Sequence, residues 1–156
     1  MKRNLTRTSI ILMTVALLGL TALTTLAGHT RPFHLVEHGT LTPVQDQPGN
    51  FIAEGTGTAT HLGSIIVHRT LSLTPAADGS GLIDVEGEAT LVAADGDELR
   101  TGLKGTLDPQ TNHAVLTYGW EGGTGRFVNA TGATVWQVDV NADQTYDVVA
   151  DGVINY

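Results

Sequence analysis

The segment Glu121-Gly122-Gly123-Thr124-Gly125-Arg126-Phe127-Val128-Asn129-Ala130-Thr131-Gly132 lies between two stretches in which apolar and polar residues alternate. Its glycines tolerate positive φ angles and close backbone contacts, which residues with a Cβ resist. Phe127, one of three phenylalanines in the chain, follows as a large apolar anchor. The segment therefore predicts a structural loop between two strands. Gly122, Gly123 and Gly125 bend the chain, Arg126 ties the loop down and Phe127 plugs one end of the fold.

The alternation extends over the rest of the chain from Phe33 onward, with the period of two that is typical of β-strands. No window shows the apolar spacing of an amphipathic helix. Turn signals such as Asp78-Gly79 and Asp95-Gly96 separate the strands. The sequence predicts eight strands, at about residues 33–41, 51–60, 64–74, 81–93, 98–107, 113–121, 131–141 and 145–154.

Eight consecutive strands joined by hairpins favour an all-β fold, an eight-stranded antiparallel up-and-down β-barrel. Closure of such a sheet removes its exposed edges. The interior of a barrel of this size holds side chains or one small ligand. A β-sandwich is the alternative architecture.

The first 27 residues have the three-part layout of a secretory signal peptide. A basic start with Lys2, Arg3 and Arg7 precedes an apolar core from Ile10 to Leu20, and the small residue Ala27 follows. Threonines interrupt the apolar run, which falls short of the ~20 apolar residues of a membrane-spanning helix. We therefore expect a signal peptide at 1–27, one domain at 28–156 and export to the periplasm or the cell exterior, with no membrane span after signal removal. An uncleaved membrane anchor is the alternative.

Charge and cysteine content exclude several classes of partner and chemistry. Without residues 1–27, the chain has five basic and 16 acidic residues, a formal net charge of −11. Phosphate backbones and anionic lipid surfaces repel such a chain, so we expect no nucleic-acid partner. The absence of cysteine excludes disulfides, thiolate chemistry, cysteine metal sites and a lipoprotein anchor.

Three motifs in fixed order carry a family resemblance. They are Gly55-Thr56-Gly57-Thr58-Ala59-Thr60-His61-Leu62-Gly63, the Asp-Gly turn before Glu98-Leu99, and the run from Gly122 to Phe127 with Ala130-Thr131-Gly132 after it. Over about residues 33–156 the chain resembles the bacterial allene oxide cyclase barrel-like proteins. Its glycine-rich run is also similar to that of the plant dirigent proteins, which share the barrel. The resemblance implies an allene oxide cyclase-like β-barrel domain and, because plant members associate, a homo-oligomer.

The resemblance implies the fold more strongly than a reaction. Plant allene oxide cyclases close a fatty-acid epoxide into a cyclopentenone inside the barrel, and dirigent proteins steer the coupling of phenoxy radicals. The catalytic residues of neither family match positions in this chain. The matching motif is architectural in both families.

Arg69 is the most informative candidate for a binding residue. It shares a strand face with the apolar residues Val67 and Leu71, and a charge on an inner face needs a partner. Glu54 or Glu37 on neighbouring strands could supply it. An Arg–Glu pair lining a ligand cavity is the functional interpretation. A structural ion pair at the barrel mouth, or an arginine whose stem lies on apolar surface, is the alternative.

Aromatic residues supply further candidates, because they form either a core or the wall of an apolar pocket. Together with a histidine at a strand end, the predicted ligand-binding residues are Arg69, Glu54, His61, Tyr118, Trp120 and Trp136. His34 and His38 would lie roughly 13 Å apart along one strand, too far for one metal ion. No metal site and no cofactor is predicted.

The sequence thus predicts an exported β-barrel that binds a small apolar or amphipathic molecule or has a structural role at the cell envelope. The alternative is an isomerase or cyclase acting on a hydrophobic, oxylipin-like substrate. No nucleophile–base motif is recognisable, and the catalytic residues of such an enzyme are unknown.

Overall fold

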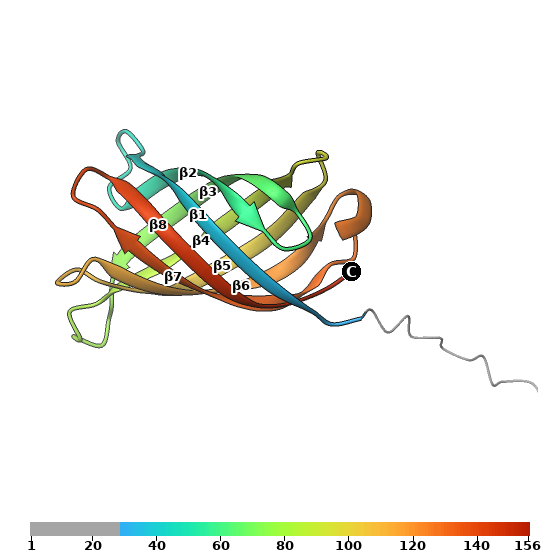
Figure 1. The fold of residues 1–156 in the computed structure, drawn as a ribbon. Helices are drawn as coiled ribbons and strands as arrows, with labels where there is room; N and C mark the ends of the chain where they lie inside the picture. Colours follow the sequence, from blue (N-terminus) through green and yellow to red (C-terminus); the bar gives the residue numbers. More distant parts are fainter. Residues whose placement is uncertain (1–28) are drawn as a thin grey trace, which may run out of the picture.

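Eight antiparallel strands follow one another in the computed structural model, which describes residues 29–156 (Figure 1). They pair in chain order, and β8 pairs back with β1 to close a barrel. The predicted all-β, eight-stranded up-and-down barrel is confirmed, and the β-sandwich alternative is wrong. The predicted signal peptide lies outside the described residues. The strands are β1 (Arg31–Pro43), β2 (Asn50–Ala59), β3 (Gly63–Pro75), β4 (Ile83–Ala93), β5 (Glu98–Asp108), β6 (His113–Gly123), β7 (Thr131–Val140) and β8 (Thr145–Asn155).

Each strand divides its side chains between the barrel interior and the surface. In β3, Ile65 and Val67 are buried, whereas Ile66 between them is half exposed. This is the alternation expected of a sheet with one wet face. The interior face therefore carries the apolar core, and the outer face carries mostly threonine and charged residues with some exposed valines and isoleucines. Within the part of the chain that the structure describes, no helix could cross a membrane.

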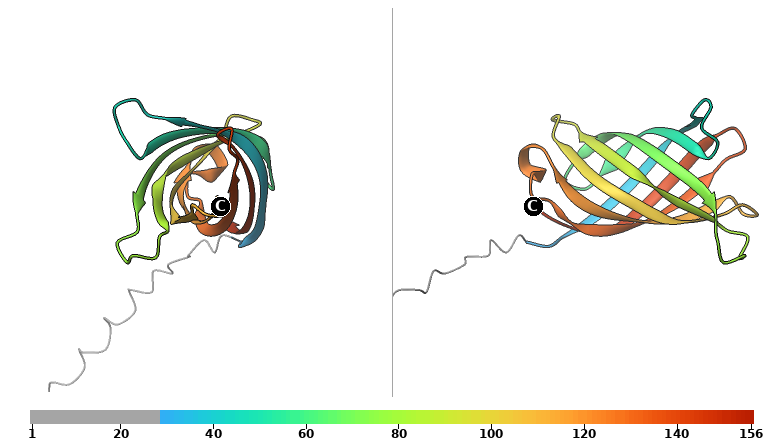
Figure 2. Two further views of the ribbon diagram at one scale, coloured as in Figure 1. Left: turned by 90° about the vertical axis from the view of Figure 1, so that its left-hand side faces the viewer. Right: turned by 180° about the vertical axis from the view of Figure 1, so that it is seen from behind.

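The two ends of the barrel differ. The turns at residues 60–62 and 94–97, the segment 124–130 and the C-terminus lie at one end, which we call the closed end (Figures 1 and 2). The turns at residues 44–49, 76–82, 109–112 and 141–144 lie at the other, the mouth. Viewed from the mouth, the strands form a ring and the segment that follows β6 crosses the far end (Figure 2).

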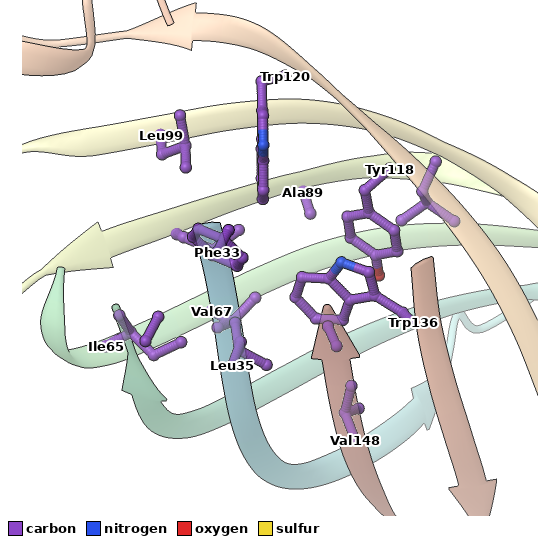
Figure 3. Packing of buried hydrophobic residues seen from close by; sticks show 14 of the residues in the cluster. Phe33, Leu35, Ile65, Val67, Ala89, Leu99, Tyr118, Trp120, Trp136 and Val148 are labelled. Carbon is purple, nitrogen blue, oxygen red and sulfur yellow. The ribbon is translucent and has the colours of Figure 1, made fainter. Parts of the chain in front are cut away.

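Aromatic side chains fill the closed end. The rings of Phe33 and Trp120 have centroids 4.9 Å apart, as Figure 3 shows from close by. Phe127 is completely buried, and its ring meets that of Tyr156 edge to face at 5.0 Å. The Trp120 indole N–H donates a hydrogen bond to the Val153 carbonyl at 3.1 Å. The closed end is therefore packed solid by large rings.

The glycine-rich segment only partly forms the expected loop. Gly122 and Gly123 belong to β6, where the pairing with β5 shifts register between Leu99 and Thr101. This irregularity is a β-bulge, and Gly122 takes a φ of 85° there. The loop proper starts only at Thr124 and contains one turn of 3-10 helix, η1 (Gly125–Phe127). The sequence alone placed the end of β6 two residues too early.

Arg126 anchors this loop to two neighbouring turns. Its guanidinium pairs with Asp95 in the turn after β4 and donates to the His61 carbonyl at 3.1 Å in the turn after β2. Its backbone N–H donates to Asp97 at 3.2 Å. All three turns of the closed end are thereby joined through one residue.

Candidate ligand-binding cavity

The half of the barrel interior next to the mouth is hollow. A cavity of about 260 Å³ extends inward from the turn between β7 and β8. The Asn141 and Gln144 side chains lie at its outer rim, and Arg69, Tyr118 and Tyr146 lie among the residues that line it. The remaining lining is apolar and comes from all eight strands: Leu41, Phe51, Ala53, Leu71, Leu73, Val85, Leu107, Ala114, Leu116, Val138, Val140 and Val148. Such a cavity suits an apolar ligand of small size.

Arg69 and Glu37 form a bidentate ion pair inside the barrel. Nη1 and Nη2 of Arg69 each donate to one Glu37 carboxylate oxygen at 2.6 Å. The exposed fractions of the two side chains are 3% and 0%. A fork-to-fork pair of this kind fixes orientation as well as supplying energy. The pair is therefore neither at the mouth nor on the surface.

Two tyrosines complete the polar cluster. The Tyr146 hydroxyl donates to Glu37 at 2.7 Å and accepts from Nη1 of Arg69 at 2.8 Å. The Tyr118 hydroxyl accepts from Nε of Arg69 at 2.8 Å. The four residues come from β1, β3, β6 and β8, so closure of the sheet is what brings them together. We call Glu37, Arg69, Tyr118 and Tyr146 the buried polar cluster.

Trp136 supports the cluster from the side of the closed end. Its ring stacks on Tyr118 with centroids 4.0 Å apart and an interplanar angle of 8°, and Figure 3 shows the two rings face to face. The Arg69 guanidinium carbon lies 4.9 Å from the indole centroid, within the range of a cation–π contact. The Trp136 N–H donates to the Thr134 hydroxyl at 2.6 Å. Trp136 is thus held in place from three directions.

A missing side chain makes room for the cluster. Gly55 lies on β2 and faces the barrel interior. A Cβ at this position would overlap the Glu37 carboxylate and approach the Tyr146 hydroxyl to 2.6 Å. The absence of a side chain lets Glu37 lie flat against the barrel wall. Glu37 consequently lies behind Arg69 and does not line the cavity. A ligand in the cavity meets hydrogen-bond donors and apolar carbon, with the carboxylate screened from it.

Burial keeps the phenols protonated. It raises the pKa of Tyr118 to about 12 and also raises the pKa of Tyr146. Burial opposes the charge on Arg69, but Tyr118 and Glu37 outweigh it and hold the pKa of the guanidinium above its ordinary value. At neutral pH the cavity therefore presents a cation that is already paired and phenols that keep their protons.

The structure brings together three of the six predicted ligand-binding residues. Arg69 and Tyr118 line the cavity and Trp136 packs against both. Glu54 is not the partner of Arg69, because it points outward from β2 and lies 3.4 Å from His68 on the surface. His61 is exposed in a turn at the closed end, where its ring contacts the Pro32 carbonyl. Trp120 belongs to the packed closed end, away from the cavity.

Two residues of the cluster were not among the predicted ligand-binding residues. Glu37 was considered as a partner of Arg69, and its place between Leu35 and Gly39 on the inward face of β1 is the signal for it. Tyr146 carries a similar signal, because it alternates with Val148 and Ala150. The strand periodicity identifies both as inward-facing, but it does not show that they meet Arg69.

A second, wider hollow lies on the outer wall, from the turn after β1 and the start of β2 across β3 and β4 to β5 and β6. It has a volume of about 960 Å³, and Glu88, Gly102, Lys104, Gly119 and Glu121 are among its lining residues. It is a depression open to solvent, formed where Gly102 and Gly119 leave the sheet bare. The interior cavity is the stronger candidate because it lies inside the barrel, is mostly apolar and adjoins a buried polar cluster.

Comparison with models of protein families and with curated proteins finds no match to this chain.

Proposed function

We propose that the protein is an exported β-barrel that binds a small apolar or amphipathic molecule in its interior. The observation that carries this proposal is the cavity of about 260 Å³, walled by apolar side chains and bounded on its inner side by the buried polar cluster. The side chains around an empty cavity lose packing contacts, so a barrel with a purely structural role gains no stability from one. Its volume has room for roughly 10 to 20 non-hydrogen atoms.

The position of the cavity supports ligand binding over a purely structural role at the cell envelope. The closed end is packed by aromatic rings, so the hollow half is confined to the mouth. The ligand reaches the cavity past Asn141 and Gln144, whose amides suit the polar end of an amphipathic molecule. The proposed relationship to allene oxide cyclase barrel-like proteins is compatible with an eight-stranded barrel.

A pair of adjacent substitutions tests binding. Ala114 faces the cavity, and Ala114→Phe fills it, whereas Val115→Phe adds the same ring to the outer face of the same strand. We expect the neutral fluorescent probe N-phenylnaphthylamine to bind the wild-type protein and Val115→Phe saturably, and Ala114→Phe not at all. Thermal unfolding shows that each variant is folded, since overpacking costs about 1 to 3 kcal/mol. Equal binding by both variants would remove the cavity from the proposal.

Export is a separate part of the proposal. It rests on the basic, apolar and small-residue layout of residues 1–27. Expression of the full chain in a bacterium and N-terminal sequencing of the exported product tests it. The expected first residue is Gly28, and a product that stays in the cell with Met1 in place contradicts it.

A second candidate function is an isomerase or cyclase for a hydrophobic, oxylipin-like substrate. It is favoured by one observation: an Arg–Glu pair with two tyrosines lies beside the apolar walls of a cavity inside the barrel. The raised pKa of Tyr118 suits a group that donates a hydrogen bond to substrate oxygen and keeps its proton. Product formation from fatty-acid epoxides, abolished by Tyr118→Phe, is the expected result. A product yield equal to the uncatalysed background contradicts it.

A further inference from the structure

The hydrogen bonds of Arg69 leave one of its N–H donors without an acceptor. A guanidinium has five N–H groups. Nε donates to Tyr118, Nη1 donates to Glu37 and Tyr146, and Nη2 donates to Glu37. These bonds account for four of the five donors. Among residues 29–156, the second N–H of Nη2 has no acceptor, and it lies on the same side of the guanidinium as Nε.

The Tyr118 hydroxyl is a second donor without an acceptor. Its oxygen accepts the bond from Nε of Arg69, and within the described residues its own proton is donated to no protein group. The Tyr146 hydroxyl differs, because its proton is donated to Glu37. A buried donor without an acceptor costs about 1 to 3 kcal/mol. Both of these donors belong to residues that line the cavity.

The charge of the site restricts what these donors can receive. Arg69 is neutralised by Glu37 through two short bonds, and both side chains are buried. A ligand carboxylate would therefore add an unpaired negative charge close to Glu37, which is costly in an apolar interior. A carbonyl or ether oxygen adds no charge and accepts two hydrogen bonds. The site thus selects for a neutral acceptor.

We infer that the ligand carries a neutral hydrogen-bond acceptor, such as a ketone or ester carbonyl, at the end that enters the barrel first. The Tyr118 hydroxyl and the Nη2 group of Arg69 donate to this oxygen, and the apolar remainder of the ligand fills the cavity toward Asn141 and Gln144. This inference rests on the proposed function and assigns Tyr118 as a specificity-determining residue.

The test compares two probes of matched size in two variants. Butyrophenone carries a carbonyl, and pentylbenzene has the same number of non-hydrogen atoms but no oxygen; each displaces N-phenylnaphthylamine if it binds. Tyr118→Phe should raise the Kd of butyrophenone about tenfold, which corresponds to 1.4 kcal/mol. The Kd of pentylbenzene should stay within about twofold of the wild-type value. Because the Kd of each probe is compared between the wild-type protein and Tyr118→Phe, the difference in hydrophobicity between the two probes cancels.

Tyr156→Phe is the matched control, because Tyr156 lies at the closed end against Phe127 and Arg31. It removes a phenol and should leave both dissociation constants unchanged. The propylbenzoate anion serves as the charged probe and should bind the wild-type protein at least about tenfold more weakly than butyrophenone. Tighter binding of the anion would overturn the neutral-acceptor inference.

The infrared C=O stretch of bound butyrophenone gives a second readout that needs no variant. Two donated hydrogen bonds should lower its frequency relative to the value in alkane. A frequency equal to that in alkane would overturn the inference, even if Tyr118→Phe failed to fold. Binding of both probes with equal responses to Tyr118→Phe would also overturn it while leaving the cavity proposal intact. No saturable binding of either probe to the wild-type protein would overturn the cavity proposal itself.

Discussion

At the scale of single residues, the most consequential side chain is Arg69, because it holds a full charge inside an apolar barrel. Its exposed fraction is 3%, and among residues 29–156 every side chain that hydrogen-bonds to its guanidinium belongs to the buried polar cluster. An ion pair of this kind is expensive to break from one side, since the remaining charge is left unpaired.

Arg69→Met should therefore destabilise the protein by about 3 to 5 kcal/mol, because Glu37 stays buried without its partner. The double variant Arg69→Met/Glu37→Met should recover at least about 2 kcal/mol of this loss. Urea unfolding of the wild type, both single variants and the double variant measures the coupling free energy. Additive losses in the double variant would contradict the role of the pair.

The phenols of the cluster predict a loss of stability in alkali. Burial raises the pKa of Tyr118 to about 12, whereas an unfolded tyrosine ionises near pH 10. The folded state keeps this proton when the unfolded state has released it, so the stabilisation is complete below pH 10 and is lost as the pH rises to 12. The expected loss for Tyr118 is on the order of 2 to 3 kcal/mol.

Unfolding free energies measured between pH 9 and pH 12 check this prediction. Tyr118→Phe should show a shallower decline than the wild-type protein over the upper half of that range. Its tyrosinate absorbance should also lack the step near pH 12. Identical slopes for the two proteins would show that Tyr118 is not the group responsible.

The sequence predicted that Arg69 needs an acidic partner but did not predict which acid it is. The strand pattern predicted that Arg69 faces inward, because both neighbours at a spacing of two are apolar. It did not select Glu37 over Glu54, because beyond Phe51 the interior face of β2 is made of alanine and glycine, while Ile52 lies outside. When small residues line the inside, apolar content no longer marks the inner face. The packing of four strands around Gly55 then decides which acid reaches the arginine.

At the scale of elements, the segment between β6 and β7 closes one end of the barrel. Phe127 is buried beneath Tyr156, whereas its neighbour Val128 is 61% exposed. The strongly apolar anchor in this loop was recognisable from the sequence. The bulge at Gly122 was not, because a bulge depends on the register between β5 and β6, which periodicity does not reveal.

Phe127→Ala should destabilise the protein by about 3 to 5 kcal/mol, since it empties a fully buried site that the surrounding rings cannot refill. Val128→Ala is the matched control and should change the stability by less than about 0.5 kcal/mol. Thermal and urea unfolding measure both. Equal and small effects would mean that the loop closes the barrel without supporting it.

At the scale of the whole molecule, the barrel is filled at one end and hollow at the other. Phe33, Trp120 and Phe127 occupy the closed end, whereas Ala53 and Ala114 are among the small residues that face the cavity. The sequence predicted the number of strands and their faces. It did not decide whether the interior is open or packed, because the free volume depends on the summed size of inward side chains from all eight strands at one level of the axis.

The closure of β1 against β8 predicts that the chain tolerates circular permutation. Arg31 pairs with Ile154, so the two ends of the described chain lie side by side at the closed end. A permutant of residues 29–156 with a short glycine–serine linker and new termini at Gly79-Ser80 should fold and retain probe binding. We expect it to lose at most about 2 kcal/mol, because the new termini lie in an exposed turn.

A permutant cut inside β5, between Gly102 and Leu103, is the control and should not fold, because it breaks a strand that pairs on both sides. Circular dichroism and probe fluorescence distinguish the two permutants. Failure of the permutant cut at the turn, with the linker intact, would show that the order of strand assembly matters more than their final pairing.

The positions of the two tryptophans have an optical consequence. Trp136 stacks on Tyr118 and lies beneath the Arg69 guanidinium, next to the residues that line the cavity, whereas Trp120 is sealed among rings at the opposite end. Their intrinsic emission therefore reports on two separate compartments of one molecule. A guest in the barrel alters the surroundings of Trp136 and leaves Trp120 as an internal reference. Binding of a ligand in the barrel should therefore change the emission of Trp136 relative to that of Trp120.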